Sequence, residues 1–217
     1  LPLLRHSPDP RQRTYLIHML AKLNIAASFL IACYEKETDV SVRRALLLSL
    51  GEYNTSELKG KDRQRLSNLV LAAYRDDSDA GVHGAAEWLG RRLELDRQLA
   101  GLDEQLQAPS PTERKPGAPL RDWYINSQGQ TFSVFPDPVE FVRGSPEDES
   151  YRAESEVQQR VRIPRSFAVA TKEVTVEQYL RFQPNARYNR HVCLDPRSPV
   201  VSLTWFEAAR YCRWLSE

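Results

Sequence analysis

The chain lacks the features that mark membrane proteins and nucleic-acid-binding proteins. No apolar run in its 217 residues approaches the roughly 18 residues of a bilayer span, and no signal peptide opens it. Its 30 basic and 29 acidic residues leave a formal net charge of +1. Such a balance gives no field to attract nucleic acid or an anionic membrane. We therefore expect neither among its partners.

Cysteine is also scarce, since the chain has only Cys33, Cys193 and Cys212. Three cysteines at these spacings form neither a disulfide framework nor a metal-ligand motif. This favours a reducing compartment, and we expect a cytoplasmic protein. The sequence opens with Leu1 and stops inside a predicted helix at Glu217. We expect an internal fragment of a longer protein, with its last domain truncated at the C-terminus.

What is present predicts a multidomain chain. Hydrophobic residues at 41% and charged residues at 27% are ordinary globular values. Residues 108–119 concentrate proline, glycine and charge, which is typical of a semi-rigid linker. We expect this linker to join an all-α segment, residues 1–107, to a second domain, residues 120–217.

The first segment contains a helical repeat. The stretch that begins at Asp39 aligns with the stretch that begins at Asp79 at a period of 40, and a copy from Asp9 fits more loosely. Each copy has an Asp to cap a helix and then an apolar stripe. Helix pairs that repeat near 40 residues are typical of HEAT-type stacks, and the pattern resembles that family. Three further helices are expected: 26–34, 65–74 and 93–106.

The second segment reads as mixed α and β structure. A hairpin is expected over residues 123–135, followed by alternating extended segments near 139–142, 161–163 and 167–169. Thr175 and Thr204 each begin a capping box, in which the Thr hydroxyl and a Gln or Glu three residues later cap a helix reciprocally. The second helix should bury the residues of one apolar face: Trp205, Ala208, Ala209, Cys212 and Leu215.

Three blocks of residues carry a family resemblance. VEFVRGS at 139–145, RSFAVATKEVTVEQY at 165–179 and PVVSLTWFEAARYCRW at 199–214 occur in this order. Together they resemble the formylglycine-generating enzyme family, the sulfatase-modifying-factor domains. The resemblance runs from about Trp123 to Glu217 and covers the front part of such a domain. Arg143 and Thr204 depart from it, because the family commonly has Met and Ser there.

The resemblance implies an α+β domain related to C-type lectins. It implies that the complete domain oxidises a Cys of a substrate protein to formylglycine with molecular oxygen and copper. The family's catalytic cysteines lie in its C-terminal part and no position here matches them, so we assign no catalytic, cofactor-binding or metal-binding residue. In the alternative, this is a non-catalytic protein-binding module of a large bacterial signalling protein, possibly kinase-linked. Both readings predict a protein as partner or substrate.

The remaining cysteines and histidines have structural explanations. Cys212 could form a redox pair with Cys193, but its place on an apolar face favours a buried hydrophobic side chain. Cys33 lies in a repeat helix and is expected in the core. His83 occupies the repeat position of Arg43, which favours a solvated or inter-helix role over a metal ligand. The other histidines are scattered: His6, His18 and His191.

Three sets of charged or aromatic residues also have structural explanations. The acidic run at 146–156 has no ordered ligand spacing for a cation, so a solvated loop is favoured. Arg160, Arg162 and Arg165 are expected on the outward side of a strand rather than at a phosphate site. Trp205 and Trp214 are expected to face the core rather than to form a ligand platform.

The predicted linker should be the first site of proteolysis. Limited digestion of the native chain should cut first between Ala108 and Pro119, because few backbone hydrogen bonds protect a segment of this composition. The fragments can be identified by mass spectrometry. A first cut between Val42 and Leu50, inside a predicted helix, would contradict the two-domain reading.

Overall fold

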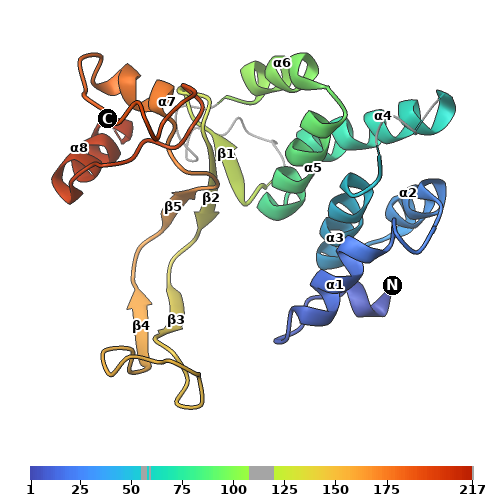
Figure 1. Ribbon diagram of the computed structural model, residues 1–217, viewed down its shortest axis with the longest axis horizontal. Helices are drawn as coiled ribbons and strands as arrows, with labels where there is room; N and C mark the ends of the chain where they lie inside the picture. The colour runs from blue at the N-terminus through green and yellow to red at the C-terminus, as the bar shows by residue number, and fades with distance from the viewer. Residues whose placement is uncertain (55–57, 59, 108–119, 217) are drawn as a thin grey trace. The chain divides into compact units, whose positions relative to one another are not determined.

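The chain divides into two compact units, Leu1–Ala168 and Val169–Glu217. This computed structural model describes residues 1–54, 58, 60–107 and 120–216 (Figure 1). The predicted linker, residues 108–119, lies outside the described residues, so the predicted boundaries of the two domains stay predictions.

The first unit opens with helices, which confirms a helical N-terminal region. A short 3-10 helix at Pro2–Leu4 is followed, within the described residues, by six α-helices. These are α1 (Arg11–Met19), α2 (Ala27–Lys36), α3 (Val40–Gly51), α4 (Gly60–Asp76), α5 (Ala80–Arg92) and α6 (Asp96–Leu106). Their succession along the unit can be followed in Figure 1.

Two of the three predicted Asp caps are formed. Asp39 accepts hydrogen bonds from the amides of Ser41 and Val42, and Asp79 accepts one from Val82. Each carboxylate thereby satisfies donors that the first turn of a helix leaves unpaired. The looser copy behaves differently, because Asp9 lies one residue before the N-cap of α1 and its carboxylate accepts from the backbone amide of Arg11.

The helix predicted over residues 93–106 begins later than expected. Helix α5 ends at Arg92, and Glu94 has a left-handed backbone with φ +63°. That conformation cannot continue a right-handed helix. The chain therefore turns here and α6 starts at Asp96, with Leu95 and Leu99 still buried on its inner side.

Four β-strands complete the first unit. Strands β1 (Trp123–Ile125) and β2 (Thr131–Phe135) form the predicted hairpin, and β3 (Val139–Arg143) pairs with β4 (Gln159–Ile163). Both pairs are antiparallel, which confirms small antiparallel sheets in this region. The first sheet has the order β1-β2-β5, and the boundary between the units falls within β5 (Phe167–Ala170).

The core of the first unit takes in two strand residues. Trp123 and Ile125 are each 1% exposed and belong to the same cluster as the buried leucines of α2 to α6. Trp123 stacks on His83 with ring centroids 3.6 Å apart, and His83 stacks on Tyr74 at 4.1 Å. The indole N–H donates to the carbonyl of Asp77 at 2.9 Å. The β1–β2 hairpin is therefore anchored on α4 and α5.

His83 is fully buried, so a solvated role is wrong and an inter-element role is found. Its Nδ1 donates to the carbonyl of Tyr74 at 2.7 Å. The two aligned positions have different surroundings. Strand β1 covers α5 at His83, whereas Arg43 of α3 forms an ion pair with Asp77. Burial also raises the pKa of the Tyr74 hydroxyl, which donates to Asp103.

The second unit contains two short helices, α7 (Val176–Phe182) and α8 (Trp205–Leu215). They are joined by a long connection, in which Cys193 is buried. No helix in the part of the chain that the structure describes is long and apolar enough to cross a bilayer.

Replacing Trp123 should destabilise the first unit strongly. Trp123→Ala removes a buried ring and its hydrogen bond, and we expect a loss of about 3–5 kcal/mol in the free energy of unfolding. Trp123→Phe should cost less, because it keeps an aromatic ring in the stack and loses the N–H donor and part of the buried ring volume. Urea denaturation measures both changes. Tyr151→Ala, at a fully exposed position, is the control; a similar loss there would contradict the anchoring role.

Candidate functional site

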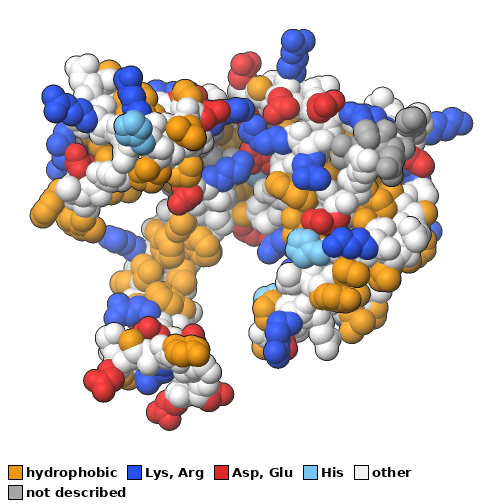
Figure 2. Space-filling view, viewed as in Figure 1, with side chains coloured by type: hydrophobic (Ala, Val, Ile, Leu, Met, Phe, Trp, Pro, Cys, Tyr) orange, Lys and Arg blue, Asp and Glu red, His pale blue; other side chains and the backbone are white. Residues whose placement is uncertain are grey.

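The residues that carry the family resemblance begin on a two-stranded ribbon. In β3 and β4, Phe141 lies opposite Val161 on one face, and Glu140 lies opposite Arg162 on the other. The side chains of Glu140 and Arg162 form an exposed ion pair, with Nε and Oε1 3.7 Å apart. Phe141 remains 43% exposed and Val142 54% exposed, on opposite faces of the ribbon. Figure 2 shows hydrophobic side chains along the ribbon and acidic side chains at its tip.

The two ends of the loop between β3 and β4 are held together by close backbone contacts and hydrogen bonds. Gly144 has φ +102°, and a Cβ there would lie 2.6 Å from the carbonyl oxygen of Val157. Next to it, the amide of Ser145 donates to the carbonyl of Glu156 at 3.0 Å, and its hydroxyl donates to the Glu156 carboxylate at 2.7 Å. Only glycine fits the first of these positions without strain.

The acidic run inside this loop behaves as the solvated segment that was expected. Most of its acidic side chains are exposed, and Arg152 folds back to donate to the carbonyl of Ser145. Within the described residues, no group of three or more His, Cys, Asp or Glu side chains could hold a metal ion. Arg160 and Arg162 point outward from β4 as predicted, and Arg165 lies exposed beyond the strand.

Both predicted capping boxes are confirmed. At α7 the Thr175 hydroxyl accepts from the Gln178 amide while the Gln178 side chain accepts from the Thr175 amide. At α8 Thr204 and Glu207 make the same exchange. The hydrogen bond from the Thr204 hydroxyl, followed by the one from its amide, holds the pKa of Glu207 below its usual value.

The two capped segments lie side by side in the second unit. Thr175 forms an antiparallel bridge with Pro199, and the amides of Val176 and Val200 bond across it to Ser198 and Val174. The extended residues ahead of each helix are thus paired, although the sequence separates them by a helix and a long connection. The Cys193 thiol donates to the carbonyl of Pro199 at 3.3 Å and closes this arrangement.

The face of α8 that packs differs from the predicted one. Tyr211 is 3% exposed and Trp214 is half-buried; both rings contact Phe182, with centroids 5.7 and 5.5 Å away. Trp205 is 76% exposed, so a core-facing role is wrong for it. Tyr211 and Trp214 bury apolar ring area against Phe182, and α8 is therefore turned with these two rings inward.

The cysteines therefore lie in three different environments. Cys193 is buried, Cys33 is half-buried beside the helical core, and Cys212 is exposed, which corrects the expectation that Cys212 is buried. A copper ion held by thiolates needs soft ligands that converge on one point. The structure gives Cys193 a carbonyl partner and turns Cys212 toward solvent, so these two residues do not fit such a site.

The histidines lie on separate elements and do not form a site. His6 precedes α1, His18 lies in α1 with its Nδ1 3.1 Å from Glu52, and His191 is exposed in the connection before α8. His83 is enclosed by aromatic rings in the first unit. Their scatter agrees with the sequence analysis.

Comparison with known proteins supports the resemblance for the second part of the chain. Residues 130–217 match the family model described as sulfatase-modifying factor enzyme 1-like domain. A domain of this type is therefore present in the chain. No curated protein and no solved structure matches the chain.

The three cysteines should differ in reactivity. In the folded chain, a charged thiol reagent should label Cys212 fastest, Cys33 more slowly and Cys193 only after denaturation, because exposure governs access to the sulfur. Peptide mass spectrometry after timed labelling measures the order. Cys212→Ser should abolish the fast phase and leave the other two unchanged. Labelling of Cys193 as fast as Cys212 would contradict the described packing.

Proposed function

We propose that the chain is part of a protein that acts on another protein, and that its domain at residues 130–217, in complete form, oxidises a Cys of that target to formylglycine. The family match carries this proposal. Molecular oxygen is the oxidant that the resemblance implies, and copper is the implied metal. The described residues contribute paired segments and capped helices to such a domain, not a pair of converging thiols.

A non-catalytic role is the second candidate, and the helical region favours it. Six packed helices with a continuous core precede the matched domain. Regular helical arrays present extended surfaces that bind proteins. In this hypothesis the chain is a binding module or scaffold of a bacterial signalling protein, with or without a linked kinase.

The finer architecture belongs to the same proposal. We place HEAT-like repeats at residues 1–107, a proline-rich linker at 108–119 and the formylglycine-generating-type domain, with a C-type-lectin-like fold, at 120–217. The formed caps at Asp39 and Asp79, one repeat apart, support the repeat assignment. A protein partner or substrate and a cytoplasmic location complete the proposal.

Trapping of an aldehyde separates the two functions. The complete protein, supplied with copper and oxygen, should convert a sulfatase-type Cys peptide to a product that reacts with a hydrazide probe, whereas the same peptide with Ser should give none. The 217-residue chain by itself should give no product, because no position in it matches the family's catalytic cysteines. An aldehyde formed by this chain and lost in Cys212→Ser would contradict that assignment.

If the complete protein yields no aldehyde from a library of Cys peptides, the catalytic proposal fails and the scaffold role stands. Mass spectrometry of the peptides reads the outcome directly, since the aldehyde and the thiol differ in mass. The same experiment without added copper shows whether the metal is required.

A further inference from the structure

The helices of the first unit enclose a groove of about 740 Å³ that the proposed function does not use. We call it the α2–α4 groove. Its lining comes from the end of α2, the start of α3, the length of α4 and the turn after α4. The lining residues that carry the argument are Tyr34, Glu37, Arg43, Asn68, Ala72 and Asp76.

One face of helix α4 forms a wall of the α2–α4 groove. Arg65, Leu69, Ala72 and Asp76 recur at spacings of three or four residues, which places them in a row along the helix. From Arg65 to Asp76 this row is about 16 Å long at 1.5 Å per residue. That length matches about five residues of an extended chain at roughly 3.3 Å each. The small side chain of Ala72 is exposed in the middle and leaves room above the helix.

Ion pairs fix both arginines of the lining. Arg65 holds the carboxylate of Glu35 through two hydrogen bonds. Arg43 pairs with the buried carboxylate of Asp77 and also donates to the Tyr34 hydroxyl at 3.0 Å. Arg43 is therefore held by a buried carboxylate, whereas the Arg65–Glu35 pair lies at the surface, with both side chains 42% exposed.

The lining has four carboxylates and two guanidinium groups, so its negatively charged side chains outnumber its positively charged ones. The two carboxylates without an ion pair to a lining arginine are those of Glu37 and Asp76. One oxygen of Glu37 accepts from the amides of Thr38 and Asp39. Asp76 pairs with Arg75 from outside the groove, where both side chains are about half exposed. This bond, together with the nearby Arg121, lowers the pKa of Asp76 and keeps it ionised. Exposed pairs of this kind contribute only about 0–1 kcal/mol, so a cation from a partner competes with Arg75 at little cost.

We propose that the α2–α4 groove binds an extended segment of a partner protein that carries a Lys or Arg side chain. The side chain's hydrocarbon stem would lie on Leu69 and Ala72, and its charge would lie against Asp76 and Glu37. The Asn68 carboxamide, exposed on the same wall, offers a polar contact to the main chain of the segment. The site lies in the first unit, apart from the matched domain, and holds whether or not that domain is catalytic.

Pools of labelled heptapeptides test this proposal on the full chain. Each pool has one fixed central residue, Arg, Lys, Glu, Ser or Leu, between randomised positions. Fluorescence anisotropy should show binding of the Arg and Lys pools at least about tenfold tighter than the Glu pool, since like charges in the groove repel the latter. Binding should weaken as salt is raised, because the carboxylates are exposed.

Matched variants locate the binding. Ala72→Lys fills the groove and adds a competing charge, and should lower the affinity for the Arg pool about tenfold. Ala100→Lys makes the same change at an exposed position of α6 and should leave it unaltered. Asp76→Asn should weaken binding several-fold, whereas Asp96→Asn, which removes another exposed Arg-paired carboxylate, should not.

Several results would overturn the proposal. These are equal binding of the Arg and Glu pools, or unchanged binding in Ala72→Lys when circular dichroism shows that the helices are intact. Self-association of the chain that Ala72→Lys abolishes would instead assign the groove to a second copy. None of these outcomes depends on aldehyde formation, so the catalytic proposal stands or falls separately.

Discussion

The stack of Trp123 on His83 and Tyr74 is the contact on which the first unit depends. It is the point where residues after 120 enter a core built otherwise by helices α1 to α6. Three planar rings in van der Waals contact bury a large apolar area, and a hydrogen bond from the indole to the Asp77 carbonyl fixes their direction. The strands β1, β2 and β5 of this sheet are only three to five residues long, and a sheet of such short strands needs packing against helices to be stable.

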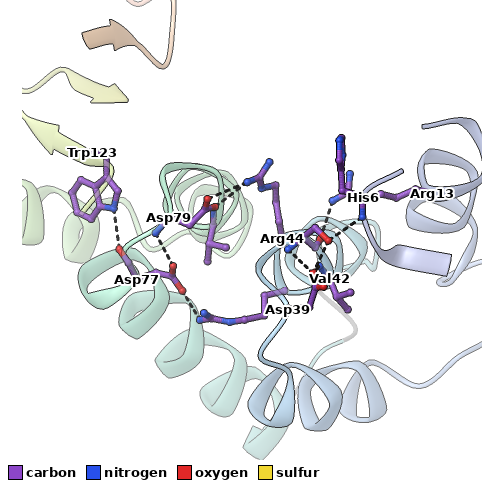
Figure 3. A network of polar contacts seen from close by, with 11 residues as sticks. His6, Arg13, Asp39, Val42, Arg44, Asp77, Asp79 and Trp123 are labelled. Atoms are coloured by element: carbon purple, nitrogen blue, oxygen red, sulfur yellow. Dashed lines mark hydrogen bonds and ion pairs between the residues drawn. The ribbon is translucent and has the colours of Figure 1, made fainter. Parts of the chain in front are cut away.

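Asp77 joins this stack to the helices through three bonds. Its carbonyl accepts from Trp123, one carboxylate oxygen pairs with Arg43 of α3, and the other accepts from the amide of Asp79. Figure 3 shows how Asp79 in turn bonds Arg44, so that the network runs from the strand to α3. The turn between α4 and α5 therefore orients the hairpin and the two preceding helices together. The carboxylates of Asp77 and Asp79 both accept from backbone amides and pair with arginines of α3.

The parts of this structure that the sequence predicted are those set by local bonds. The Asp39 and Asp79 caps, the two Thr capping boxes and the turn of the hairpin all depend on residues within four positions of one another. The parts that it missed depend on distant partners. For His83 the sequence left a solvated and an inter-helix role open, because nothing near it in sequence shows that Trp123 covers it. The packed face of α8 was misplaced because periodicity weighs Ala and Cys equally with Tyr211 and Trp214. The sequence did not predict the α2–α4 groove either, because its walls come from three helices whose packing depends on distant residues.

Adjacent arginines on α3 explain why the groove keeps its acid excess. A helix turns about 100° per residue, so Arg43 and Arg44 face different neighbours. Arg43 reaches Asp77, while Arg44 crosses Gly81 to reach Asp79, and a Cβ at Gly81 would lie 2.2 Å from its guanidinium carbon. Each arginine is held where it stabilises the α4–α5 turn. Neither is free to swing toward Glu37 or Asp76. The bonds that make the helical unit rigid thus leave Glu37 and Asp76 without an ion pair to the groove's own arginines, so a cationic side chain from another protein competes only with Arg75 for Asp76.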